Sequence, residues 1–134
     1  MIDSLLTEDY LEQCTSSTGT FNDYLHGDCH KVVYTLQRLY PLGIPLLLME
    51  YDDYVQEDCL LHTVLRVGDK FIDIRGVHRS IDSVLDAFDY SDFYTLEGIG
   101  HLQQLVQNGH LAPIQQYEFE ELTMFVQRHI RYFT

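Results

Sequence analysis

The spacing of apolar residues changes along this chain, and the change predicts helices at both ends with strands between them. In residues 29–40 apolar side chains recur every three or four positions, which is typical of a helix with one face on a core. Residues 45–50 form a short apolar run that favours a buried strand. Helical spacing returns in residues 118–132. The pattern therefore predicts strands in the middle of the chain, with helices before and after them.

The remaining segments fit the same scheme. Two strands, 59–67 and 70–75, are predicted on either side of Gly68-Asp69, a two-residue hairpin signal. The other expected elements are helices at 4–14, 80–88 and 101–107, and an aromatic, acidic loop at 89–100. Because helices flank the strands rather than alternate with them, we predict an α+β fold. A length of 134 residues favours one domain over residues 1–134.

The predicted hairpin fixes which side chains meet. With Gly68-Asp69 as the loop, Val67 faces Lys70, and the register then makes His62 and Asp73 diagonal neighbours on one face. A slip of one residue would put them on opposite faces. The expected register therefore lets a carboxylate reach an imidazole, while the opposite face of this strand takes Leu61, Thr63, Leu65 and Val67.

Cys29 opens the most regular predicted helix. The partial positive charge of a helix N-terminus favours a thiolate. A thiolate nucleophile also needs a neighbouring base, and the base needs an acceptor that orients it. His62 and Asp73 are the candidates for these two roles. The sequence therefore predicts a catalytic triad of Cys29, His62 and Asp73.

The surroundings of Cys29 suggest how a reaction intermediate would be stabilised. Gly27 gives the backbone room for a tight entry into the helix. The backbone N–H of Cys29 lies at the helix start and is a candidate donor to an oxyanion. A second donor has to come from elsewhere, and Asn22 and Tyr24 are the upstream candidates.

These motifs resemble those of a known group. Gly27-Asp28-Cys29 at a helix start, a strand with His62, and Asp73-Ile74-Arg75-Gly76 look like the papain-like cysteine hydrolases. More narrowly, they resemble the compact members near transglutaminases and bacterial cell-wall amidases, which include small bacterial and phage proteins. The resemblance covers residues 27–76. It implies a central helix carrying the nucleophile against a small antiparallel sheet, with further helices at the C-terminal end.

The implied function is a thiol-dependent hydrolase or acyl-transferase acting on a peptide bond, an isopeptide bond or a glutamine side chain. The resemblance implies that Cys29 is the nucleophile, His62 the base and Asp73 its orienting partner, with a protein or peptide substrate and no cofactor. Structural alternatives exist, because a free cysteine on an apolar helix face is commonly a buried core residue. Asp73 between two isoleucines is the hardest to explain in this way, because a buried carboxylate needs a partner.

Zinc binding is a competing interpretation. Cys29-His30 and Cys59 with His62 offer two thiols and two imidazoles. Cys59 and His62 are three positions apart on a strand and so point to opposite faces, and adjacent helix residues also diverge. The usual knuckle spacing is absent, so we expect no metal.

The charge limits the partners. The chain carries 21 acidic and 8 basic residues, a net charge of −13, which would repel a phosphate backbone and argues against nucleic-acid binding. A second class of function is an acidic, non-catalytic binding module, such as an inhibitor or nucleic-acid mimic that engages a basic protein. Its acidic clusters would be 52–53, 57–58 and 118–121.

The expected location is the cytoplasm, with delivery into a host cell as a further possibility. No apolar run approaches the 18 residues of a membrane helix, and residues 1–4 have no basic signal-peptide region. The three cysteines are an odd number without a secretory context, so no disulfide framework is expected.

Overall fold

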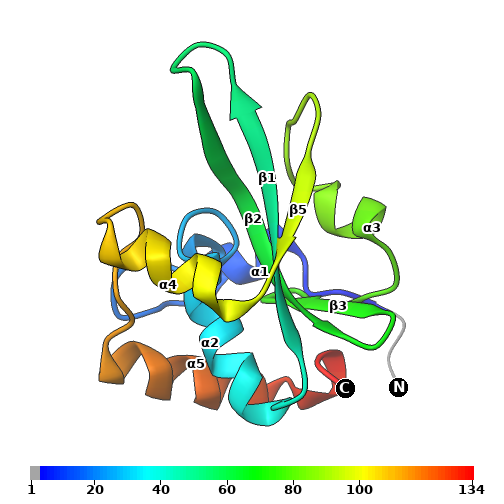
Figure 1. Ribbon diagram of the computed structural model, residues 1–134. Helices are drawn as coiled ribbons and strands as arrows, with labels where there is room; N and C mark the ends of the chain where they lie inside the picture. The colour runs from blue at the N-terminus through cyan, green and yellow to red at the C-terminus, as the bar shows by residue number, and fades with distance from the viewer. Residues whose placement is uncertain (1–3) are drawn as a thin grey trace.

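The computed structural model describes residues 4–134 and contains a five-stranded antiparallel sheet in the order β4-β3-β2-β1-β5 (Figure 1). The strands are β1 (Ile44–Asp52), β2 (Glu57–Val67), β3 (Lys70–Asp73), β4 (Gly76–His78) and β5 (Tyr94–Glu97). The helices are α1 (Glu8–Gln13), α2 (Cys29–Leu39), α3 (Ile81–Leu85), α4 (Ile99–Gln107) and α5 (Gln116–Arg128), with 3-10 turns at Phe21–Tyr24 and Ile130–Tyr132. The predicted α+β class is confirmed.

The two faces of the sheet have different covers. On one face, α2 packs on β2 and β3 and is itself backed by α5, and this layer forms the larger core. Its buried members include Val33, Leu36, Leu47, Leu65, Ile72, Leu122 and Phe125. The other face carries a smaller cluster with α3, made of Leu46, Leu48, Val64, Val84 and Leu85. Because side chains alternate between the two faces along β1 and β2, these strands contribute residues to both apolar layers.

Helix α2 is anchored at its first turn. The chain enters it through Gly27, whose φ of +127° is a conformation that residues with a Cβ rarely adopt. The Lys31 ammonium, although 6% exposed, forms an ion pair with Glu118 of α5 at 2.7 Å and lies 3.5 Å from Asp28. This buried pair locks the start of α2 to α5.

Two strands were not anticipated. The predicted strand 70–75 ends at Asp73, whose carboxylate accepts from the backbone N–H of Arg75 at 2.9 Å and turns the chain. Gly76 follows with φ +122°, and a Cβ there would lie 2.5 Å from the Tyr132 carbonyl oxygen, so glycine is required before β4. Strand β5 lies inside the predicted loop 89–100, where its four residues are too few to show a clear alternation.

A β-bulge corrects the predicted side of Leu61. Leu48 pairs with His62 and Met49 with Leu60, so Leu61 is an extra residue in β2. Leu61 consequently packs with the small cluster around Val64, on the side predicted for His62 and not on the opposite one. The bulge lies directly beside His62.

Other boundaries differ by a few residues. The predicted helix 4–14 begins only at Glu8, because Thr7 is extended and caps it, and Leu6 donates its N–H to the Arg75 carbonyl at 2.8 Å. The helix predicted over 80–88 ends at Leu85, and the last helix starts two residues early and ends at Arg128. Among the helices of residues 4–134, none has the length and apolar character needed to cross a membrane.

Candidate active site

The predicted hairpin register is confirmed, and it brings two of the three candidate residues together. Val67 pairs with Lys70 across the turn, as expected. The Nε2 atom of His62 in β2 then lies 3.0 Å from Oδ2 of Asp73 at the end of β3. Both side chains are buried, with His62 at 0% and Asp73 at 1% exposure. The carboxylate therefore holds the imidazole in one orientation.

The hydrogen bond to Asp73 leaves the other ring nitrogen of His62 for the thiol. Nδ1 is buried, and no atom of residues 4–134 completes a hydrogen bond to it. Cys29, at the first turn of α2 and 5% exposed, lies near enough to influence the pKa of this imidazole. Because Nε2 is occupied, Nδ1 is the nitrogen available to exchange a proton with Sγ.

Charge favours the protonated imidazole. Burial by itself lowers the pKa of His62, but the thiolate charge of Cys29 and the hydrogen bond to Asp73 outweigh it and raise the pKa to about 9. The effect of Cys29 is the largest of those that raise it. The site therefore favours a protonated His62 imidazole.

Asp73 has more partners than a simple triad needs. Its Oδ2 accepts from Nη2 of Arg75 at 2.6 Å, and its Oδ1 lies 2.9 Å from Nε2 of His78. Burial tends to raise the pKa of Asp73, but the hydrogen bonds from His62 and His78 and the charge of Arg75 hold that pKa well below its usual range. Asp73 is thus a permanent carboxylate at the centre of a buried network.

Arg75 and His78 were missed by sequence reasoning. Arg75 entered the sequence motifs only as part of residues 73–76, and His78 was in none of them. Strand β4 pairs His78 with Phe71, two residues from Asp73 and on the same face, so a prediction of β4 would have brought the two together. The signal was Gly76, which reverses the chain between Asp73 and His78.

Helix α3 anchors this network from the other side. Nη2 of Arg75 donates to the Val84 carbonyl at 2.8 Å, and Nδ1 of His78 lies 2.8 Å from Oγ of Ser83. Ser80 caps the helix by accepting from the Ser83 N–H. The position of the carboxylate is therefore determined by α3 as well as by the hairpin.

Phe88, just after α3, covers the imidazole. Its ring centroid lies 4.6 Å from that of His62 at an interplanar angle of 34°, and 5.0 Å from that of His26. His26 is in turn bonded to Glu8 at 2.7 Å. Phe88 itself is half-buried. This aromatic cover helps to close the site in the conformation described.

The donors proposed for an oxyanion are only partly supported. The backbone N–H groups of Cys29 and His30 have no acceptor among residues 4–134, so they are available at the helix start. The Tyr24 hydroxyl donates to Glu121 at 2.9 Å, and the Asn22 amide donates to Glu12 at 3.4 Å. These two side chains have partners elsewhere and are poor candidates for the second donor.

The groups considered for zinc are used in other ways. Nε2 of His30 donates to the Ala112 carbonyl at 2.6 Å, and burial lowers the pKa of His30. Cys59 lies near the tip of the β1–β2 hairpin, where slight burial and the charges of Asp52 and Glu57 raise its pKa. No group of three or more His, Cys, Asp or Glu side chains within residues 4–134 is arranged to hold a metal ion.

Comparison of the chain with protein-family models, with curated proteins and with solved structures finds no match. An inference about function therefore has to rest on the motif in residues 27–76 and on the geometry of the side chains described above.

Proposed function

We propose that this protein is a thiol-dependent hydrolase or acyl-transferase that acts on an amide, on a papain-like or transglutaminase-like fold. Cys29 is the nucleophile, His62 the general base and acid, and Asp73 the residue that orients His62. The observation that carries the proposal is the buried imidazole of His62, which is held by Asp73 at 3.0 Å and whose pKa is raised by the nearby Cys29. Three chemically complementary groups from α2, β2 and β3 meet there.

The chemistry follows from the geometry. His62 Nδ1 takes the proton of the Cys29 thiol, and Sγ attacks the amide carbon. The N–H groups at the start of α2 stabilise the negative oxygen that develops. The imidazolium then returns its proton to the leaving nitrogen as the C–N bond breaks, which leaves a thioester on Cys29. Water resolves this thioester in a hydrolase, and an amine resolves it in a transferase.

The fold supports the same family. Helix α2 carries the nucleophile at its first residue and packs on an antiparallel sheet that supplies the base and its partner. Helices α4 and α5 follow at the C-terminal end. The substrate class is a protein or peptide amide, whether a peptide bond, an isopeptide bond or a glutamine side chain. A reduced thiol is compatible with the cytoplasm or with delivery into a host cell.

Thiol reactivity provides the first test. With limiting iodoacetamide at mildly acidic pH, Cys29 should be alkylated before Cys14 and Cys59, which serve as internal controls. His62→Gln should abolish this preference, because the thiolate loses its imidazolium. Equal labelling of the three cysteines in the wild-type protein would contradict the role of Cys29.

Amide turnover provides the second test. A mixture of peptides containing glutamine and lysine isopeptide bonds should show cleavage, deamidation or amine incorporation by mass spectrometry. Cys29→Ala should abolish the activity, and Cys14→Ala should retain it. An activity that survives Cys29→Ala would exclude the thioester mechanism.

A second candidate is an acidic binding module that uses this fold without catalysis. The β1–β2 hairpin extends beyond the rest of the sheet as an arm, since residues 50–59 pair only with each other (Figure 1). The arm carries Glu50, Asp52, Asp53, Glu57 and Asp58 with no Lys or Arg, and Tyr54 at its tip is 96% exposed. A basic protein partner fits this surface, and such binding would survive Cys29→Ala.

A further inference from the structure

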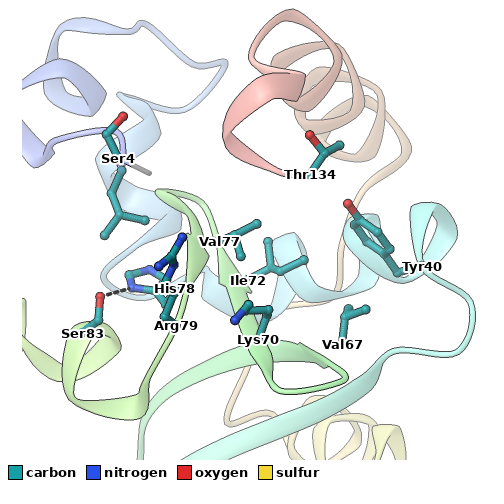
Figure 2. Close-up of a pocket in the computed structure, with 11 residues that line it drawn as sticks. Ser4, Tyr40, Val67, Lys70, Ile72, Val77, His78, Arg79, Ser83 and Thr134 are labelled. Carbon is teal, nitrogen blue, oxygen red and sulfur yellow. Dashed lines mark hydrogen bonds between the residues drawn. The ribbon is translucent and has the colours of Figure 1, made fainter. Parts of the chain in front are cut away.

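His78 is a second buried imidazole on Asp73 that the proposed mechanism does not use. Its side chain is 0% exposed, and its Nε2 atom lies 2.9 Å from Oδ1 of Asp73. Its Nδ1 atom lies 2.8 Å from Oγ of Ser83 in α3. His78 and Ser83 also line a cavity of about 330 Å³, where Figure 2 shows the hydrogen bond that joins them. Both ring nitrogens of His78 therefore have a partner.

The carboxylate determines which nitrogen of His78 carries a proton. Asp73 is ionised, so its two oxygens only accept hydrogen bonds. Nε2 of His78 must then carry a proton, as Nε2 of His62 does. In the neutral ring, Nδ1 has a free lone pair and accepts from the Ser83 hydroxyl. The hydrogen bonds consequently run in one direction, from Ser83 through His78 to Asp73.

The two histidines bind opposite oxygens of the Asp73 carboxylate. Oδ1 accepts from His78 and from the Arg75 backbone N–H, both at 2.9 Å. Oδ2 accepts from His62 at 3.0 Å and from Nη2 of Arg75 at 2.6 Å. The Nε atom of Arg75 lies almost midway, 3.3 Å from Oδ1 and 3.2 Å from Oδ2. Each oxygen thus has two short hydrogen bonds, which fill the acceptor positions of an ionised carboxylate.

Without His78, the contacts to Oδ1 within residues 4–134 would all come from Arg75. The Arg75 side chain contacts both oxygens, so it does not determine which of them faces His62. His78 belongs to β4 and is bonded to α3 through Ser83, so it holds Oδ1 from a separate part of the fold. A carboxylate that turns away lengthens its hydrogen bond to His62, and such a bond weakens steeply as its geometry worsens.

We propose that His78 is a positioning residue for the proposed thiol reaction. It keeps the carboxylate of Asp73 turned toward His62, so that Nδ1 of that ring stays available to Cys29. This inference rests on the proposed function, since it assigns His78 a role in the same reaction. The role differs from that of Arg75, which supplies the counter-charge of the buried carboxylate.

Two substitutions at position 78 separate positioning from packing. The amide of His78→Gln reaches about as far as Nε2 and can donate to Asp73, whereas the shorter amide of His78→Asn cannot. Alkylation of Cys29 by iodoacetamide should therefore be slowed about ten-fold or more in His78→Asn, and at most about three-fold in His78→Gln. Urea unfolding of the same full-length variants is measured alongside, because a purely structural role predicts that the alkylation rates follow the stabilities.

Proton NMR of the full-length protein gives a readout that does not depend on catalysis. The Nε2–H protons of His62 and His78 should both resonate downfield and exchange slowly with solvent, because both are buried and bonded to one carboxylate. His78→Asn should shift the His62 signal, and His78→Gln should largely retain it. Absence of amide turnover in the wild-type protein would refute the proposed function and would not alter these signals.

Three results would overturn the positioning role: wild-type alkylation in His78→Asn, equal slowing in both variants at position 78, or rates that simply follow stability. If His78→Asn does not fold, Ser83→Ala takes its place, since it loosens the His78 ring without removing it. An unchanged His62 signal in Ser83→Ala would then overturn the role. His110→Asn, at an exposed position, is the control and should change neither the alkylation rate nor the signal.

Discussion

Replacing Asp73 by Asn tests whether the buried carboxylate orients the base or only holds the fold together. The amide would retain the shape of the side chain but lose its charge, and its NH₂ group would face donors from Arg75, His62 and His78. The Arg75 side chain, 7% exposed, would be left without its counter-charge. Removing one partner from a buried pair costs about 3–5 kcal/mol, and we expect a loss of unfolding free energy in this range.

A second substitution separates this structural loss from the catalytic one. Arg75→Met removes the cation that Asp73→Asn leaves unpaired, so the double variant should be more stable than Asp73→Asn by roughly 0.5–3 kcal/mol, the usual coupling between contacting residues. Recovery should be partial, because the Val84 carbonyl also loses its donor. The alkylation rate of Cys29 should stay low in both variants, because His62 lacks its charged acceptor in each.

The assays are urea unfolding for stability and intact-mass kinetics of Cys29 alkylation. If the double variant regains the wild-type alkylation rate together with stability, Asp73 acts only through the fold and the orienting role is wrong. If the double variant is no more stable than Asp73→Asn, the unpaired charge of Arg75 is not what destabilises Asp73→Asn. The wild-type protein and Arg75→Met are the two remaining members of this double-mutant cycle.

Three further predictions follow from named contacts. The pKa of His62 rises from 6.5 to about 9, so its charge stabilises the fold fully below pH 6.5, and this stabilisation is lost as the pH rises through 9. Thermal melts across that pH window should show a smaller loss of stability at alkaline pH for Cys29→Ala than for the wild-type protein. The reason is that the charge of Cys29 is a main cause of the shift. Phe88→Ala should speed alkylation of Cys29 several-fold by removing the ring that covers His62, and an unchanged rate would show that Phe88 does not limit access. Lys31→Met should lower the unfolding free energy, measured by urea titration, by about 3–5 kcal/mol, since it leaves Glu118 buried without its cation. Restored stability in the double variant Lys31→Met/Glu118→Gln would support this cause.

The parts of the site that the sequence predicted depend on local rules. Gly68-Asp69 determines a two-residue turn, and the alternation of a strand then brings His62 and Asp73 to one face without knowledge of the rest of the fold. Similarly, Gly27 and the apolar spacing place Cys29 at a helix start. Both inferences need information from only a few neighbouring residues.

The parts that escaped prediction depend on contacts between distant segments. Strand β4 has three residues and β5 has four, and each is stabilised by pairing with a neighbouring strand rather than by a pattern of its own. Missing β4 meant missing His78. The bulge at Leu61 is likewise a property of the β1–β2 pair and not of either strand alone.

Cys29 and Asp73 affect the pKa of His62 in different ways. Asp73 raises the pKa of His62 more through its hydrogen bond than through its charge, and the same carboxylate also accepts from Arg75 at 2.6 Å. The charge of the Cys29 thiolate exceeds the hydrogen bond with Asp73 in raising this pKa. The charge at Cys29 therefore favours the His62 imidazolium, while Asp73 fixes the ring. A substrate that displaces the thiolate charge by forming a thioester would remove the main support for the imidazolium, and this favours transfer of the proton to the leaving group at the step that needs it.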